Sequence, residues 1–377
     1  MTDPLPPTSF DPTHDEASRQ NFVGALKGYA NMVLEGHLAE VYDRSLAPAF
    51  QDRHGRPPES RGDAEAVMAA HPLYHLWAQM TYHSQELLWR SVMATTQRTL
   101  GDQQRRVAAL ADRADKLGSM TLDPALEVPR PVSSVEIHRQ PGGYTHEAYR
   151  GDISAALSYM GAIEIYRNAK AMGTGAAAGS DDIGQFLCDV IQRRFPDLAP
   201  TAILDMGCGT GEQTVAFKKR FADADVYGID CSAPFVRFAH ATAEGQDLAL
   251  HVRQMDAQRT GFEDASFDLI VSIILFHETS HSQVPRILRE CRRLLRPGGV
   301  MLHLDVPYQP HRLPLVKQVT NNWQVRHNGE PFWTRFAELD LKRMLIDAGF
   351  DADAAIVDYE KVGQGEYLVF GGRERTV

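Results

Sequence analysis

The sequence predicts an α/β fold built on a mostly parallel sheet and preceded by an all-helical domain. From about Pro200 onward, strand-sized apolar runs alternate with helical segments, which is typical of a mostly parallel sheet. Before residue 123, apolar residues instead recur at the spacing of amphipathic helices. The 377 residues are enough for two domains at roughly 150 residues each, which agrees with this division.

In the first part of the chain the pattern is helical throughout. Apolar side chains recur every three or four positions over residues 22–42. A second helix is expected over residues 72–100, because Pro72 is favourable at the first helical position, and Gly101 is expected to break it. A third helix is expected over residues 105–117.

A connector follows the helical part. Prolines and glycines crowd residues 123–143, where repeated proline fixes φ and removes donors. Residues 144–170 are expected to form a helix. A further helix ending near Phe195 can be capped by Asp181 or Asp182.

The second half supplies the strands of the predicted sheet. Strands are expected within residues 201–206, 225–230, 247–256, 267–276 and 300–306, and two closing strands within DAAIVDY and YLVFG. Helices are expected over residues 283–295 and near 336–348.

Composition and charge narrow the function classes. Lys and Arg number 39 against 49 Asp and Glu, so the formal net charge is −10, which disfavours nucleic acid as a partner. Residues 1–17 are polar and Pro-rich and are predicted to be disordered, with no features of a secretion signal. No apolar run approaches the roughly 18 residues of a membrane span. The four cysteines are widely spaced, so we expect a cytoplasmic protein without disulfides.

The strongest motif is a glycine-rich turn after the first predicted strand of the sheet. It reads Asp205-Met206-Gly207-Cys208-Gly209-Thr210-Gly211. Such a strand-to-helix turn lets backbone approach a ligand closely and points N–H groups at it. Two carboxylates end the next strands: Asp230 can accept both hydroxyls of a ribose, and Asp256, followed by Ala257, can recognise an adenine edge.

These motifs, in this order, resemble those of the class I S-adenosylmethionine-dependent methyltransferases. The nearest likeness is to the small-molecule enzymes of ubiquinone and menaquinone biosynthesis, over about residues 181–371. The resemblance implies a Rossmann-like, mostly parallel, seven-stranded sheet and S-adenosylmethionine as cofactor, with S-adenosylhomocysteine as product. The cofactor-binding residues that it implies are Asp205, Gly207, Cys208, Gly209, Thr210, Gly211, Asp230, Cys231, Met255, Asp256, Ala257 and Ser272.

The resemblance also completes the predicted division of the chain. The segments are a disordered N-terminus at 1–17, a helical domain at 18–122, a connector with lid helices at 123–180 and an S-adenosylmethionine-binding methyltransferase domain at 181–377.

A nicotinamide dinucleotide is the competing cofactor for such a turn. Its fingerprint is G-x-G-x-x-G, whereas this turn has glycine at the fifth position and Glu212 at the sixth. Asp205 before the turn suits a cationic amino-acid moiety better than a pyrophosphate. The sequence therefore favours S-adenosylmethionine.

Catalytic residues are predicted where the sheet faces the cofactor. His277 and Glu278 follow the fourth strand of the sheet, and Tyr149 lies in the predicted lid. A buried structural role for His277 is an equally open interpretation. Further residues are expected to contact the substrate: Tyr144, His146, Tyr159, His303, Tyr308, Trp323 and Trp333.

Histidines on one helix raise the question of a metal. His71, His75 and His83 lie close together in the sequence, but ligands from a single helix rarely close round an ion. We therefore predict no metal site.

The predicted function is transfer of a methyl group to a small-molecule acceptor, with C- or O-methylation of an apolar metabolite favoured. S- or N-methylation of a small amino-acid-derived metabolite is an alternative, and an inactive S-adenosylmethionine-binding regulator is another. The Asn/Asp-Pro-Pro-aromatic run of amino-group methyltransferases is absent, since residues 272–275 read Ser-Ile-Ile-Leu. A homodimer through the helical domain is also predicted.

Overall fold

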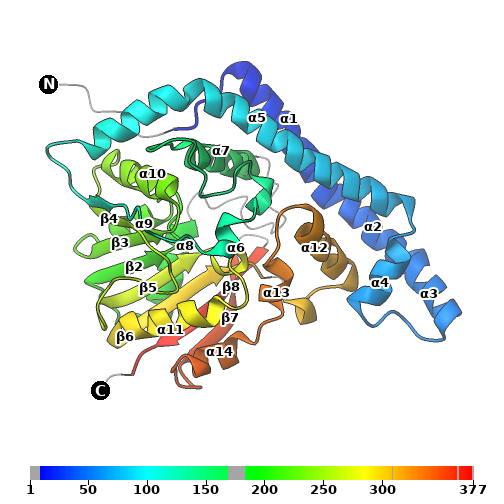
Figure 1. The fold of residues 1–377 in the computed structure, drawn as a ribbon. Coiled ribbons are helices and arrows are strands. Elements are labelled where there is room, and N and C mark those ends of the chain that lie inside the picture. Colours follow the sequence, from blue (N-terminus) through cyan, green and yellow to red (C-terminus); the bar gives the residue numbers. More distant parts are fainter. Residues whose placement is uncertain (1–8, 169–182, 308, 363–364, 376–377) are drawn as a thin grey trace.

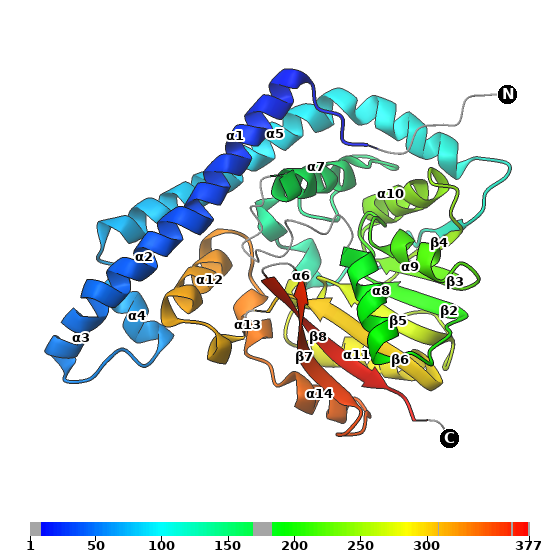
Figure 2. The ribbon, with the colours of Figure 1, turned by 180° about the vertical axis from the view of Figure 1, so that it is seen from behind.

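The computed structural model describes residues 9–168, 183–307, 309–362 and 365–375. Its centre is a single twisted sheet with helices on both faces and a long helical layer across one edge (Figures 1 and 2). The strands are β1 (Ser119–Thr121), β2 (Ala202–Met206), β3 (Asp225–Asp230), β4 (Leu250–Gln254), β5 (Phe267–Ile273), β6 (Leu295–Asp305), β7 (Ala355–Val362) and β8 (Gly365–Arg373).

The sheet has eight strands in the order β1-β4-β3-β2-β5-β6-β8-β7. Neighbours from β1 to β6 run parallel, and β8 is antiparallel to both β6 and β7. The predicted mostly parallel sheet is confirmed, but the predicted count of seven is wrong. The extra strand β1 comes from the end of the predicted helical domain, where Ser119 pairs with His251. A three-residue edge strand is too short to leave a periodic signal in the sequence.

Two apolar cores cover the two faces of the sheet. On one face pack α8 (Ile183–Arg194), α9 (Thr214–Arg220) and α10 (Ala233–Glu244). On the other pack α11 (Val284–Leu294), α13 (Trp333–Ala337) and α14 (Leu341–Asp347). The helix predicted near residues 336–348 is in fact the pair α13 and α14, because Asp340 caps a new helix by accepting a bond from the Arg343 N–H.

The helical layer begins with an almost continuous helical path. It consists of α1 (His14–Gly28), the π-helical η1 (Tyr29–Leu34), α2 (Glu35–Val41), the π-helical η2 (Tyr42–Leu46) and α3 (Ala47–His54). The helix starts inside the segment predicted to be disordered, because Thr13 and Glu16 form a capping box. After α4 (Arg61–Met68) comes α5, the 40-residue helix Pro72–Ala111.

The prediction that Gly101 ends a helix is wrong. Helix α5 continues through Gly101 to Ala111, so residues 105–111 of the separate helix predicted over 105–117 are its last part, and residues 112–117 are not helical. A glycine inside a helix costs only about 1 kcal/mol. Burial of Thr99, Gln103 and Val107 on either side of Gly101 offsets that cost.

Connecting segments join the helical layer to the sheet. These are α6 (Arg130–Ser133), the 3-10 turn η3 (Ile137–Arg139), α7 (Ser154–Asn168) and α12 (Leu315–His327). The helix predicted from residue 144 starts only at Ser154, whose N–H is capped by Asp152. Asp181 and Asp182 lie outside the described residues.

Two apolar clusters fix the helical layer on the sheet domain. One holds Leu88 and Trp89 of α5 with residues of α7 and α10. The other holds Leu38 and Trp77 with Trp323 of α12. Both views show α5 lying across α7 and α10, with α1 beside α5 (Figures 1 and 2). Among the described residues, no helix has the length and apolar content to span a bilayer.

Candidate functional site

The predicted glycine turn links β2 to α9 in a conformation that favours glycine. Gly207, Gly209 and Gly211 have φ values of +73°, +54° and +80°. A Cβ on Gly207 would lie 2.7 Å from Leu275 Cδ1, and one on Gly211 would lie 3.0 Å from Ala239 Cα. A Cβ on Gly209 would meet no heavy atom within 4 Å. The turn is therefore packed on two sides and open at Gly209.

Two predicted carboxylates flank the open side of this turn. Asp230 Oδ2 accepts a bond from the Gly209 N–H at 3.1 Å, and its Oδ1 accepts one from the Ser232 N–H at 2.8 Å. Asp205 is buried and accepts a bond from Thr214 Oγ1 at 2.6 Å, whereas its Oδ1 has no hydrogen-bond partner among the described residues. Burial raises the pKa of Asp205 to about 7 and that of Asp230 to about 6. These groups fit a ligand with polar donors.

Most of the other predicted cofactor-binding residues lie in the turn itself or directly after β3 and β4. Cys208 packs under Gly228, where an added Cβ would lie 3.0 Å from the sulfur. The Met255 N–H donates to the Asp230 carbonyl at 3.0 Å. The Asp256 carboxylate accepts a bond from the Gln258 N–H at 2.9 Å. Three more predicted residues belong to this region by position: Thr210, Cys231 and Ala257.

The predicted residues His277 and Glu278 lie at the carboxyl end of β5, in the 3-10 turn η4 (Phe276–Glu278). Ile274 before it has φ +60°, which is unusual for a β-branched residue and reverses the chain sharply. Asp305, at the end of β6, then accepts bonds from the Phe276 N–H at 2.8 Å and, through Oδ1, from His277 Nδ1 at 2.7 Å. One buried carboxylate thereby fixes both the turn and the imidazole.

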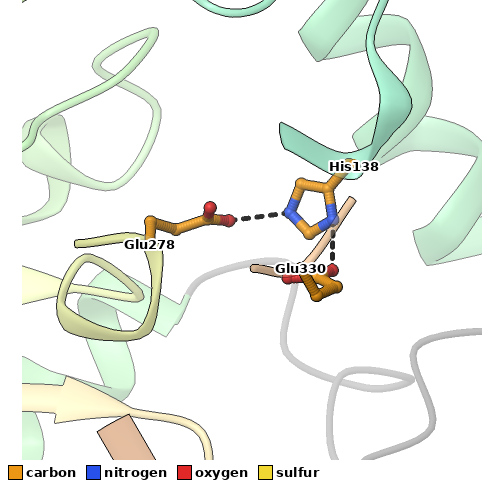
Figure 3. A group of neighbouring side chains, drawn as sticks. All are labelled: His138, Glu278 and Glu330. Carbon is orange, nitrogen blue, oxygen red and sulfur yellow. Dashed lines mark ion pairs between the residues drawn. The ribbon is translucent and has the colours of Figure 1, made fainter. Parts of the chain in front are cut away.

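A second histidine and a second glutamate complete a buried group (Figure 3). His138 Nε2 lies 2.8 Å from Glu278 Oε1, and His138 Nδ1 lies 2.5 Å from Glu330 Oε1. His277 Nε2 and the Tyr144 hydroxyl each lie 3.5 Å from Glu278 Oε1. We call His138, His277, Glu278, Asp305 and Glu330 the His–carboxylate cluster.

Opposite charges hold the His–carboxylate cluster together. Burial favours neutral imidazoles, but Asp305 and Glu278 outweigh it and raise the pKa of His277 to about 10. Glu330 and Glu278 likewise raise the pKa of His138 well above its usual range despite burial. Burial opposes ionisation of Glu278, yet the two imidazoliums hold its pKa well below the usual range. Each imidazole is thus protonated and shared between two carboxylates.

Residues of the helical layer reach this cluster. The His138 carbonyl accepts bonds from Gln85 Nε2 and Trp89 Nε1, both at 2.7 Å. Lys27 of α1 donates to Gln85 Oε1 at 2.5 Å, and burial lowers the pKa of this lysine to about 7. The sequence analysis did not identify Lys27, His138 or Glu330 as site residues.

A backbone contact explains how the missed residues meet. The His138 N–H donates to the Gly329 carbonyl at 2.7 Å, and a Cβ on Gly329 would lie 2.5 Å from Arg139 N. His138 itself has φ +53°. Proline and glycine around this segment suggested only a connector, so no periodic pattern could have revealed the pairing.

Three predicted substrate residues lie at the cluster. Tyr144 joins it to the glycine turn, because its carbonyl accepts a bond from Ser232 Oγ at 2.7 Å while its hydroxyl faces Glu278. The Tyr159 ring lies 5.5 Å from that of Tyr144. The Trp333 ring lies 6.3 Å from that of His277. The cluster is therefore adjacent to the cofactor turn.

Two predicted residues belong to the core instead. Ser272 and His303 are fully buried and hydrogen-bond to each other, with 2.9 Å between Ser272 Oγ and His303 Nδ1. Burial lowers the pKa of His303 to about 3, so this imidazole is neutral. Aromatic rings of Phe276 and Phe370 surround it. The structure thus places Ser272 and His303 in the core, and the cofactor contact of Ser272 and the substrate contact of His303 stay predictions.

Other predicted residues lie away from the cluster. Tyr149 is 49% exposed and donates to Gln104 of α5, so the prediction that it is catalytic is not supported. His146 is exposed. Trp323 packs on Trp77 inside the helical layer. Tyr308 lies outside the described residues.

The histidines considered for a metal have local roles. The N-cap residue of α5 is His71, whose Nδ1 accepts a bond from the Leu73 N–H. His83 is 59% exposed in its side chain and pairs with Glu86 at 3.5 Å.

Comparison with known families decides what the glycine turn belongs to. Residues 203–299 match the family described as "Methyltransferase domain". The chain contains a class I methyltransferase domain. S-adenosylmethionine is the cofactor of this class, and the open side of Gly209 together with the unpaired Asp205 oxygen fits it.

Several curated proteins match parts of this chain. It is 33% identical to a demethylmenaquinone methyltransferase of Thermus thermophilus over 123 residues. This match covers 32% of this chain and 55% of that protein. It is 29% identical over 183 residues to a tRNA N(3)-methylcytidine methyltransferase of Drosophila melanogaster, 44% of this chain and 56% of the relative. It is also 29% identical over 211 residues to a malonyl-[acyl-carrier protein] O-methyltransferase of Coxiella burnetii, 53% of this chain and 69% of the relative. The chain thus spans little more than half of the first two relatives.

Among solved structures, the chain is similar to a phosphoethanolamine N-methyltransferase of Haemonchus contortus. The likeness has a TM-score of 0.38 and 15% identity, and covers 50% of this chain and 52% of that one.

Proposed function

We propose that this methyltransferase transfers the methyl group of S-adenosylmethionine to a small molecule bound beside the His–carboxylate cluster. The observation that carries the proposal is the adjacency of the cluster and the glycine turn, which Tyr144 joins through Ser232 and Glu278. When bound, S-adenosylmethionine supplies an electrophilic methyl group. Asp205 would hold its amino-acid end, and Asp230 would hold its ribose.

The cluster supplies what an acceptor with an exchangeable proton needs. Such an acceptor loses a proton as it gains the methyl group, and the Glu278 carboxylate would accept that proton, because both imidazoles of the cluster are already protonated. Asp305 keeps the protonated His277 ring oriented toward Glu278. This chemistry favours C- or O-methylation over methylation of a thioether or tertiary amine, which release no proton.

Burial of the cluster favours a small acceptor over a nucleic acid. Its side chains are between 0% and 27% exposed. The net charge of −10 also disfavours a polyanionic substrate. Methylation of tRNA, the activity in the name of one relative, is the alternative that experiments should include.

Calorimetric titration tests the cofactor half of this proposal. Wild type should bind S-adenosylmethionine and S-adenosylhomocysteine, and Asp230→Ala should weaken binding at least tenfold, about 1.4 kcal/mol. Asp223→Ala, at an exposed position in the loop before β3, is the matched control and should bind as wild type. Equal binding by wild type and Asp230→Ala would refute the assignment of Asp230.

We also propose a homodimer through the helical layer. Four apolar side chains of α1 and η1 are strongly exposed: Phe22 at 64%, Tyr29 at 46%, Met32 at 66% and Val33 at 39%. Their helical spacing makes a continuous stripe that a second copy would cover. Light scattering after size exclusion should give a dimer mass for wild type and a monomer mass for Met32→Glu. A monomeric wild type at micromolar concentration would contradict the proposal.

A further inference from the structure

Three members of the His–carboxylate cluster are arranged as a cation site. His138, Glu278 and Glu330 each offer a ligand atom, and these atoms lie within 4.8 Å of one another. Metal bonds of about 2.0–2.2 Å place ligand atoms roughly 3–4 Å apart, so the three groups are close enough to surround one ion. Since the two glutamates face different nitrogens of His138, one of them would turn toward the nitrogen that binds the ion. The three residues come from η3, η4 and the loop before α13, so an ion would join three separate segments (Figure 3).

An unsatisfied oxygen marks the same place. Glu330 is 8% exposed, and its Oε1 pairs with His138. Its Oε2 is buried and has no hydrogen-bond partner among the described residues. Leaving a buried acceptor unpaired costs about 1–3 kcal/mol, and more when it is charged. A cation between the carboxylates would satisfy it.

His277 is oriented as a fourth ligand. Its Nδ1 is held by Asp305 at 2.7 Å, and its Nε2 faces Glu278 Oε1 at 3.5 Å. Metal-binding histidines usually carry a carboxylate or carbonyl on the nitrogen away from the ion, which fixes the tautomer and the ring. Asp305 occupies that position.

The charge of the cluster also favours a cation. Three carboxylates, those of Glu278, Asp305 and Glu330, lie around two imidazoles inside the protein. An ion bound to one nitrogen of His138 would replace the proton on that nitrogen and would place a higher positive charge among the carboxylates. Mixed imidazole and carboxylate ligands suit divalent first-row transition metals such as Zn²⁺, Fe²⁺ and Mn²⁺.

We propose that the His–carboxylate cluster binds one divalent first-row transition-metal ion. His138, Glu278 and Glu330 are its ligands, His277 is the fourth, and Asp305 is the positioning residue. The sequence predicted no metal site because its neighbouring histidines lie on one helix, whereas these ligands come from distant segments. Any use of the ion to orient an acceptor oxygen rests on the proposed function, but ion binding does not.

Metal titration of the full chain tests the site directly. Protein stripped with a chelator is titrated with Zn²⁺ by calorimetry and with Mn²⁺ by electron paramagnetic resonance, without S-adenosylmethionine. We expect one ion per chain with a Kd of about 1 μM or tighter for Zn²⁺. His138→Ala and Glu330→Gln should weaken binding at least tenfold, and Asp305→Asn by about 10–100-fold.

Matched controls separate this site from others. His83→Ala removes an exposed histidine that also pairs with a glutamate, and it should bind metal as wild type does. Glu330→Gln keeps the shape of the side chain and should bind S-adenosylmethionine within about twofold of wild type, because Glu330 does not touch the glycine turn. No stoichiometric ion, or equal affinity in wild type and Glu330→Gln, would overturn the metal site while leaving the cofactor assignment intact.

Discussion

Replacing Asp305 by Asn should destabilise the methyltransferase domain strongly, because the two oxygens of this carboxylate serve three donors. The side chain is fully buried. It accepts bonds from His277 Nδ1 at 2.7 Å, the Phe276 N–H at 2.8 Å and the Val306 N–H at 2.7 Å. The amide of Asn has one oxygen and one NH₂ group, so in either orientation a donor faces a donor.

The size of the Asp305→Asn effect follows from these contacts. An orphaned buried donor costs about 1–3 kcal/mol, and a hydrogen bond to a charged group contributes about 1.5–3 kcal/mol. Since the two terms overlap, we expect a loss of about 2–4 kcal/mol. At about 2–4 °C per kcal/mol for a domain of this size, Tm should fall by roughly 4–16 °C.

Urea unfolding and thermal scans measure this change. Asp264→Asn is the matched control, because Asp264 is 78% exposed and pairs with Arg293 at the surface, where the substitution should cost under about 0.5 kcal/mol. A cycle with His277→Ala should show coupling of at least about 1 kcal/mol. A change below about 0.5 kcal/mol for Asp305→Asn would refute the role given to Asp305.

Three further predictions concern the helical layer and the glycine turn. Hydrogen bonds from Arg98 lower the pKa of Glu16 to about 2, so the substitution Glu16→Gln should lower the unfolding free energy by about 1 kcal/mol above pH 5. The urea midpoints of variant and wild type should converge as the pH falls toward 2. A difference that stays constant with pH would contradict this. Burial lowers the pKa of Lys27 from 10.5 to about 7, so the lysine charge destabilises the fold below pH 7, and this penalty fades between pH 7 and 10.5. Lys27→Met should therefore raise the unfolding free energy by at least about 1 kcal/mol at pH 6. An unfolding free energy below that of wild type would show that the charge is stabilising. Gly209→Ala should cost only about 1 kcal/mol in unfolding but should weaken S-adenosylmethionine binding at least tenfold. Gly211→Ala, which meets neighbouring atoms, should cost more stability in urea unfolding. Unchanged cofactor affinity in Gly209→Ala would show that Gly209 does not face the ligand.

The parts of the site that the sequence predicted lie within single strand-to-helix connections. Gly207, Gly209 and Gly211 were predictable because a tight turn that opens onto a ligand requires positive φ, and all three adopt it. His277 and Glu278 were predictable because they follow a buried parallel strand, and such strands end at the ligand edge of a sheet.

The remaining parts depend on contacts between distant segments. His138 and Glu330 meet through the backbone bond from the His138 N–H to the Gly329 carbonyl, for which the local sequence has no signature. Gly101 lies inside α5 because packing on both sides outweighs its low helix propensity. Propensity and spacing describe short segments, whereas tertiary packing decided these features.

Methyl transfer from labelled S-adenosylmethionine tests the central claim most directly. Purified protein is incubated with methyl-labelled cofactor and either a low-mass metabolite fraction or total tRNA, with Asp230→Ala as the binding-deficient control. We expect label in a low-mass product, with none in tRNA and none from Asp230→Ala. Label in tRNA alone would contradict the proposal of a small-molecule acceptor. If wild type binds the cofactor but transfers label neither to metabolites nor to tRNA, the proposed catalysis is contradicted.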